Sequence, residues 1–374
     1  MIKPKLISAA VAILFCILLL NVSAQDSLQN TFIDISKVSV FKPITGNVNS
    51  TYIERKENPV SIYPQLRFTP GLKHKLAIPN NYVTKKALLK FNVCNTADTA
   101  CAVYFFPSIF YEDISLYRVN GNEVKALPEI LPPIDDSMGY RMIRLEPHDS
   151  ATILAELSFV KTYINTIRPR LINPGHLGTF MATLRSTHYT HNLVTFIFCG
   201  LLLMMILFSM TNFFQGSNRD FLYYSGYAFF LGSMLLTKAL FDFRLNELSF
   251  FLEGYFDYIM QCIGILFYML FMQRFLDTRS KHPFLYRFYN IGVIMLILSM
   301  TVYTWFHYFS DNFVAENMVE NDTKILLLIM IVVFLVYSVR QWKDKLMRFL
   351  FWGNLLLLIF SVISLVTSML DSVF

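Results

Sequence analysis

Residues 193–214 decide the fold: they read LVTFIFCGLLLMMILFSMTNFF and contain no charged side chain. An apolar run of about 20 residues is long enough to cross a bilayer as a helix. Five more such stretches follow in the second half of the chain, at residues 221–240, 256–272, 288–306, 325–339 and 349–370. Because a helix satisfies its own backbone hydrogen bonds in lipid, residues 186–374 are predicted to form an all-α transmembrane bundle of six spans.

The composition of the whole chain agrees with a membrane protein. Of its 374 residues, 55% are hydrophobic and only 16% are charged, whereas about a quarter of an average soluble protein is charged. The net charge of +6, from 32 Lys and Arg against 26 Asp and Glu, is small and does not indicate a nucleic-acid partner. These values argue against a cytosolic globular enzyme and against a disordered chain.

Residues 1–24 are typical of a secretory signal peptide. Lys3 and Lys5 precede an apolar run at residues 6–20, and Val22, Ser23 and Ala24 offer a small-residue cleavage site. This order is the export pattern. The alternative is an uncleaved first membrane helix, although the run is short for a span. In both cases the chain after residue 24 is expected to begin outside the cytosol.

Residues 25–185 are expected to form an exported antiparallel β-sandwich with a jelly-roll-like arrangement. Asn120 and Gly121 lie between two short alternating stretches and predict a hairpin. Several short strands separated by turns are typical of a sandwich or a jelly roll. The alternating stretches are residues 87–93, 101–106, 114–119, 140–145 and 151–159.

The charges between the apolar stretches predict the orientation of the bundle. The first, third and fifth connections are mainly basic, and the second and fourth are mainly acidic, so the basic ones are expected in the cytosol. The basic residues are Arg219, Arg274, Arg279, Lys281, Arg287, Arg340, Lys343, Lys345 and Arg348. The acidic residues are Asp242, Glu247, Glu253, Asp257, Asp311, Glu316, Glu320 and Asp322. The basic loops are candidates for contact with anionic lipid or a cytosolic signalling partner, and topology alone also accounts for them.

Six residues of the predicted sandwich are candidates for binding a ligand. Aromatic rings stack on sugars and a tyrosine hydroxyl can form a hydrogen bond, while core packing is the alternative role for each ring. An acidic and a basic side chain nearby suit a polar ligand, and a solvated strand face is their alternative role. The candidates are Tyr104, Phe106, Tyr111, Asp113, Tyr117 and Arg118.

Two pairs of residues have a further predicted role. Cys94 and Cys101 flank a polar loop between two predicted strands, and an oxidising compartment favours a disulfide between them over two free thiols. Lys238 and Asp257 lie near the ends of the second and third apolar stretches. They are candidates for an intramembrane ion pair, and location in the headgroup layer is the alternative.

The chain resembles the bacterial seven-transmembrane receptors with diverse intracellular signalling modules. The resemblance is carried by FYEDISLY at residues 110–117 with Asn120 and Gly121, by residues 199–212, by NRDFLYY at residues 218–224, and by FMQRFLDTRSKHP at residues 271–283. It implies a jelly-roll sensor domain of carbohydrate-binding type, located in the periplasm, and a helical bundle in the inner membrane. It also implies a cytosolic output module.

The sequence departs from the pattern of this family at its end, where we expect neither the seventh span nor the output module in this chain. A truncated gene, a fragment and a receptor that works through a partner are the expected explanations. The leading functional prediction is a transmembrane signalling receptor for an extracytoplasmic small molecule or carbohydrate. The alternatives are the sensor portion of a histidine kinase and a transporter or channel component. The sequence contains no Gly-x-Ser-x-Gly, P-loop, His-Glu-x-x-His or Gly-x-Gly-x-x-Gly motif. No enzyme activity, cofactor or metal is therefore predicted.

Overall fold

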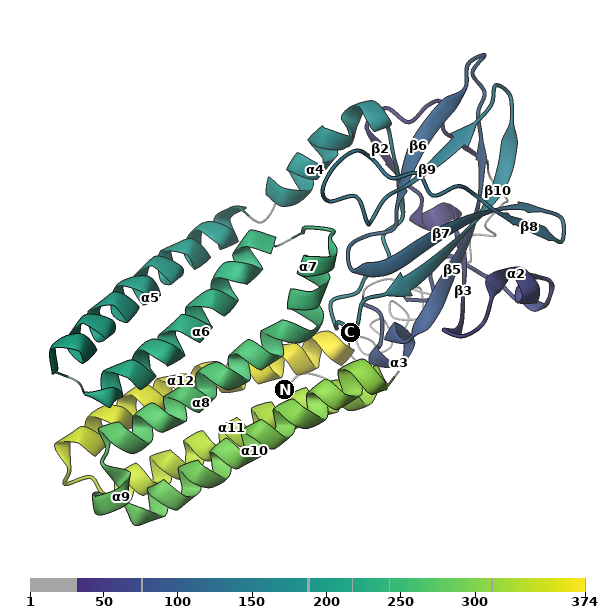
Figure 1. The fold of residues 1–374 in the computed structure, drawn as a ribbon. Coiled ribbons are helices and arrows are strands. Elements are labelled where there is room, and N and C mark those ends of the chain that lie inside the picture. The colour runs from purple at the N-terminus through teal and green to yellow at the C-terminus, as the bar shows by residue number, and fades with distance from the viewer. Residues whose placement is uncertain are drawn as a thin grey trace, which may run out of the picture. The chain divides into compact units, whose positions relative to one another are not determined.

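The computed structural model describes residues 32–74, 77–186, 189–216, 218–241, 243–310 and 312–373, with the side chains of 189–191 and 364–373 left out. The predicted signal peptide, residues 1–24, therefore lies outside the described residues, as do Asp242 and Asp311. β-strands fill the first part of the described chain and long helices fill the second (Figure 1).

Two β-sheets form the first domain. The larger sheet has the order β4-β3-β5-β10-β7-β8, with β1 added beside β5, and the smaller has the order β2-β11-β6-β9. The strands are β1 (Ile33–Asp34), β2 (Phe41–Pro43), β3 (Asn49–Glu54), β4 (Thr69–Pro70), β5 (Lys85–Cys94), β6 (Cys101–Phe106), β7 (Tyr111–Asn120), β8 (Glu123–Ala126), β9 (Arg141–Leu145), β10 (Ser150–Phe159) and β11 (Arg170–Ile172).

The two sheets pack face to face around one hydrophobic core. Phe91 on β5 and Phe105 on β6 stack across the space between the sheets, with ring centroids 5.4 Å apart. Both rings are almost fully buried, together with alternate residues of β7, β9 and β10. This alternation arises because successive side chains of a strand point to opposite faces. The arrangement is a β-sandwich.

The predicted strands agree closely with the observed ones. β6 spans the predicted residues 101–106, and the other four predicted stretches lie within or overlap β5, β7, β9 and β10. The predicted hairpin joins β7 to β8, and Gly121 adopts a φ of +62° in its turn. The predicted antiparallel sandwich is confirmed, and the two-residue strand β1 is an addition that runs parallel to β5. The jelly-roll arrangement stays a prediction.

Short helical segments complete the sandwich. They are η1 (Thr45–Asn47), α2 (Pro59–Ile62), η2 (Tyr63–Gln65), α3 (Asn80–Val83) and η3 (Pro174–His176), followed by the longer α4 (Leu177–Ser186). Tyr63 of η2 packs with Leu88 and Leu154 on the outer face of the larger sheet. Phe180 of α4 packs with Tyr104 and Phe106 on the outer face of the smaller sheet. Each sheet therefore has part of its outer face covered by the protein itself.

The second domain is helical, as predicted. Its elements are α5 (Tyr189–Gly216), α6 (Arg219–Phe241), α7 (Glu247–Phe251), the π-helical turn η4 (Leu252–Phe256), α8 (Asp257–Phe275), α9 (Thr278–Lys281), α10 (Pro283–Phe309), α11 (Phe313–Arg340) and α12 (Lys345–Val373). Within the described residues, five segments are long and apolar enough to cross a membrane: Asn192–Gly216, Glu247–Phe275, Pro283–Phe309, Phe313–Arg340 and Lys345–Ile363. This is a multi-pass membrane protein.

The second predicted span corresponds to α6, which is not among those five. With 23 residues, α6 is about 35 Å long. Its tyrosines and Lys238 make it less apolar than its neighbours. It packs against both α5 and α8, and Figure 1 shows the α5–α6, α8–α10 and α11–α12 connections at one end of the bundle. These connections are the three basic ones of the sequence.

Replacing Phe105 tests the sandwich core. Phe105→Ala removes one of two stacked rings and leaves a cavity, so we expect the free energy of unfolding to fall by about 3–5 kcal/mol. Urea unfolding of the full chain in detergent micelles, followed by circular dichroism of the sandwich, measures it. Phe32→Ala is the control, since that ring is 54% exposed, and its effect should stay within about 0.5 kcal/mol. Equal effects of the two substitutions would contradict this core.

Candidate functional site

Three of the predicted ligand-binding aromatics are buried. Tyr104 and Phe106 lie beneath α4 on the smaller sheet, where Phe106 stacks on Tyr140 with ring centroids 4.8 Å apart. Tyr111 is in the sandwich core, and its hydroxyl donates a hydrogen bond to the Thr166 carbonyl oxygen at 2.8 Å. Burial raises the pKa of Tyr111 well above its usual value. None of these rings presents a free face for stacking on a sugar.

Arg118 and Asp113 are both paired within the sandwich. Arg118 binds Asp149 through two hydrogen bonds of 2.9 and 3.0 Å, which lower the pKa of the Asp149 carboxyl. Asp113 is exposed, accepts a hydrogen bond from the Ser115 hydroxyl, and lies 3.6 Å from the Arg141 guanidinium. The structure therefore does not bring Asp113 and Arg118 together as one polar site.

Tyr117 belongs to a polar row that the sequence prediction missed. The Tyr117 hydroxyl donates to Glu156 Oε2 at 2.7 Å, and Lys86 Nζ lies 2.7 Å from Glu156 Oε1. The three residues come from β7, β10 and β5, which are neighbours in the larger sheet. Burial and the adjacent carboxylate raise the pKa of Tyr117. The alternation of β5 and β10 indicates that Lys86 and Glu156 face outward, but only the strand register places them beside Tyr117.

The side chains of this row are suited to recognising a polar molecule. Glu156 is only 5% exposed, and its two carboxylate oxygens are satisfied by Tyr117 and Lys86. A phenol, a carboxylate and an ammonium group in a row offer donors and acceptors to hydroxyl groups. Within the described part of the chain, no group of three or more His, Cys, Asp or Glu side chains is placed to hold a metal ion.

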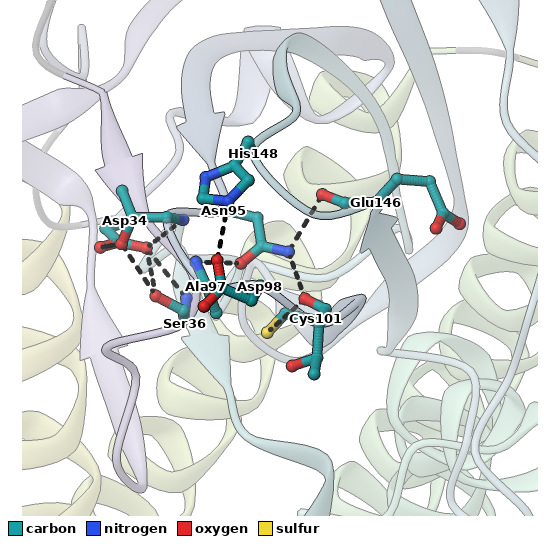
Figure 2. Close-up of polar contacts among 10 residues, drawn as sticks. Asp34, Ser36, Asn95, Ala97, Asp98, Cys101, Glu146 and His148 are labelled. Atoms are coloured by element: carbon teal, nitrogen blue, oxygen red, sulfur yellow. Dashed lines mark hydrogen bonds and ion pairs between the residues drawn. The ribbon is translucent and has the colours of Figure 1, made fainter.

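The predicted disulfide is absent, because Cys94 and Cys101 are free thiols. The prediction assumed that the two strands form a hairpin, whereas β5 and β6 belong to opposite sheets. Packed sheets lie about 10 Å apart, and a disulfide needs Cα atoms within about 7 Å. Hydrogen bonds close the loop instead: the Asn95 side-chain amide donates to the carbonyl oxygens of Thr99 at 2.8 Å and Glu146 at 3.0 Å (Figure 2).

The same end of the sandwich contains a second polar cluster, around Asp34 (Figure 2). Ser36 and Thr96 each donate a hydroxyl hydrogen bond of 2.6 Å to the Asp34 carboxylate. Desolvation raises the pKa of Asp34, but these hydrogen bonds outweigh it and hold that pKa well below its usual range. His148 and Asp98 pair nearby at 2.9 Å. These contacts join strand β1 and the loops at this end of the sandwich to one another, so we assign the cluster a structural role.

Lys238 and Asp257, the predicted intramembrane pair, are in contact. Lys238 Nζ on α6 lies 2.8 Å from Asp257 Oδ2 at the start of α8. The second carboxylate oxygen, Oδ1, is buried and has no hydrogen-bond partner. The pair joins α6 to α8 next to the turn η4.

The sandwich contacts the bundle at the connection between α6 and α7. Leu245 of this connection packs with Phe106 and Tyr140, and its carbonyl oxygen accepts a hydrogen bond from Met138 N at 3.3 Å. Gly139 makes this approach possible, because a Cβ there would lie 2.8 Å from Leu245 Cδ1. Tyr104 and Phe106, two of the aromatics proposed as ligand contacts, thus form part of a junction between the domains.

Three further contacts extend this junction. Phe250 of α7 packs on Phe110, with ring centroids 6.1 Å apart. A Cβ at Gly254 of η4 would lie 3.3 Å from the Lys161 carbonyl oxygen. Phe313, the first residue of α11, is buried within the sandwich core cluster. Sequence reasoning missed this junction, since residues so far apart share no pattern along the chain.

Thiol labelling tests the correction made for the cysteines. We expect the full chain, purified without reductant, to react with a maleimide at Cys94 and Cys101 to the same extent before and after treatment with reductant, because both are free and only half-buried. Cys262 is 1% exposed and serves as the unreactive control. Labelling of Cys94 and Cys101 that appears only after reduction would show that the two residues form the disulfide after all.

The comparisons with known proteins agree with the helical half of the structure. Residues 191–374, from α5 to the end of the chain, match the profile of the family described as 7TM diverse intracellular signalling. No curated protein matches the chain. The helical part of the chain, residues 191–374, therefore belongs to the seven-transmembrane family with diverse intracellular signalling modules.

Proposed function

We propose that this membrane receptor binds a small extracytoplasmic molecule of carbohydrate-like chemistry on its sandwich. The bundle then passes the bound state to a cytosolic output module or partner. The family supplies the signalling role. The polar row Lys86–Glu156–Tyr117 is the observation that carries the ligand proposal.

The row supports a hydroxyl-rich ligand for two reasons. Its carboxylate and ammonium groups are held in place by each other, so a ligand meets groups that are already oriented. Tyr117 adds a half-buried ring with a polar tip beside them. Aromatic side chains combine apolar contact area with a hydrogen-bonding group, and sugars present both kinds of surface.

The junction between the domains supports transmission. The sandwich contacts the connection between α6 and α7 and the beginning of α11. The basic connections lie at the other end of the helices (Figure 1), and they carry Arg274, Arg279, Lys281, Arg340, Lys343 and Lys345. This separation favours an inner-membrane protein with its N-terminal domain in the periplasm. The basic connections are the proposed contact surface for the cytosolic partner, with anionic lipid around them.

A change in the bundle requires that the ligand bind one state better than another. Two apolar clusters, around Leu245 and around Phe250, join the sandwich to the α6–α7 segment. A packed junction of this kind transmits small displacements, because close-packed side chains do not deform continuously. We therefore place the transmission step at the α6–α7 segment.

Binding to the full chain in lipid nanodiscs tests the ligand proposal. A panel of simple sugars, oligosaccharides and soluble cell-wall fragments is titrated by calorimetry. We expect at least one member to bind, and Glu156→Gln to weaken that binding by about ten- to hundredfold, the effect of losing a hydrogen bond to a charged group. Tyr163→Phe is the control, since this exposed tyrosine lies outside the row. A panel without any binder, or a binder insensitive to Glu156→Gln, contradicts the proposed site.

Leu245→Ala tests transmission separately from binding. Leu245 is 1% exposed at the junction, so its truncation should abolish the ligand-induced change in the bundle while leaving the affinity within about twofold. In a Trp305→Phe background, the fluorescence of Trp342 and Trp352 reports on the basic end of the helices. Leu248→Ala is the matched control, because Leu248 is 52% exposed. A full fluorescence response in Leu245→Ala would exclude this route.

A further inference from the structure

A lysine of the sandwich holds the end of α10. Lys161 follows β10, and its Nζ donates hydrogen bonds to the carbonyl oxygens of His307 at 2.7 Å and Ser310 at 2.9 Å. The last carbonyl oxygens of a helix have no partner within the helix, and a positive charge at that end is favourable. Lys161 therefore fixes the position of the sandwich relative to α10.

A pair of titratable groups, the half-buried His307 and the buried Glu316, lies at the same helix end. His307 Nδ1 on α10 is 2.7 Å from Glu316 Oε1 on α11. Glu316 is 1% exposed, and its second oxygen, Oε2, has no partner. His307 is in the last turn of α10 and Glu316 in the first turn of α11.

The surroundings of the pair come from the sandwich and from several helices of the bundle. Within the described residues, Tyr255 of η4 lies over the imidazole with ring centroids 4.9 Å apart, and Tyr303 and Tyr308 flank it on α10. The Tyr303 hydroxyl donates to the Gly254 carbonyl oxygen at 3.1 Å. The charged groups facing this region are Lys161 from the sandwich, Glu253 of η4, the Glu320–Lys324 pair on α11, and the Lys238–Asp257 pair on α6 and α8.

We propose that the His307–Glu316 pair is a proton-binding switch that sets how firmly Lys161 holds α10 to the sandwich. The inference rests on the proposed function only in treating the contact between sandwich and bundle as a signalling contact. Its ligand is the proton on the sandwich side of the membrane.

The direction of the switch follows from the charges. Histidine is the side chain whose charge ordinarily changes between pH 5 and 8. When His307 is neutral, Glu316 has no cationic partner in the pair, and its negative charge at this end of α10 favours the Lys161 ammonium there. When His307 takes up a proton, it neutralises Glu316, and two cations then compete at one helix end. Acidification is therefore expected to weaken the hydrogen bonds between Lys161 and the end of α10, and alkaline conditions to strengthen them.

Hydrogen exchange of the full chain in lipid nanodiscs tests the switch without any ligand. Exchange in peptides covering residues 159–165 and 312–318 is compared at pH 5.5 and 7.5, after correction for the intrinsic pH dependence of exchange. We expect several-fold faster corrected exchange at pH 5.5 in the unmodified protein. His307→Asn keeps a hydrogen-bonding group near the Nδ1 position but does not titrate, so this pH difference should vanish.

His282→Asn is the matched control. His282 is also buried and contacts a hydroxyl, that of Tyr337, through Nδ1 at 3.0 Å. It lies before α10, at the opposite end of that helix, and its replacement should leave the pH difference intact. Lys161→Met should give fast exchange at both pH values, which keeps the test decisive if His307→Asn does not fold.

Three results would overturn the proposal: no pH difference in the unmodified protein, a difference that persists in His307→Asn, or slow exchange in Lys161→Met. Because no ligand is added, these results are independent of the sugar titrations and of Leu245→Ala. A protein that binds no sugar and still shows the His307-dependent exchange would retain the switch and lose only the ligand proposal.

Discussion

Helix ends that meet the sandwich must have their backbone groups satisfied by the protein, and this constraint shapes the whole junction. Inside the bundle each helix pairs its own amides, because lipid offers no hydrogen bonds. At the sandwich end, Asn246 caps α7 through Ser249 N and Asn312 caps α11 through Ala315 N. Lys161 covers the carbonyl oxygens at the end of α10. The polar requirements of the helix ends thus bring specific side chains to the contact between domains.

The π-helical turn η4 also contributes to the contact between the sandwich and the bundle. A π-helical turn shifts the hydrogen-bonding register of a helix, and such turns are frequent at functional sites. Here it allows the Gly254 carbonyl oxygen to accept the Tyr303 hydroxyl of α10, while Gly254 itself approaches Lys161. The turn therefore connects α8, α10 and the sandwich at one point. The turn is therefore in contact with residue 161 of the sandwich and with α10.

The aromatic residues of the sandwich look alike in the sequence but occupy two different environments in the structure. Tyr104 and Phe106 support the junction from beneath α4 and Leu245, whereas Tyr117 lies in the polar row of the larger sheet. A receptor needs both a surface for its ligand and a packed path away from it. Because these residues lie on different sheets, the proposed ligand site and the proposed transmission path involve different side chains, which substitutions can alter independently.

The sequence by itself determined the two-part organisation, five of the strands, the β7–β8 hairpin and most of the helices. These features depend on the spacing of apolar residues and on the length of apolar stretches, which can both be seen in the sequence itself. Only the tertiary structure decided that Cys94 and Cys101 belong to opposite sheets, that Tyr104 and Phe106 are covered, and that Glu156 joins Lys86 to Tyr117. The contact of Lys161 with α10 joins residues 146 positions apart. No local pattern encodes such a contact, because it exists only once strand register and helix packing have fixed where distant side chains meet.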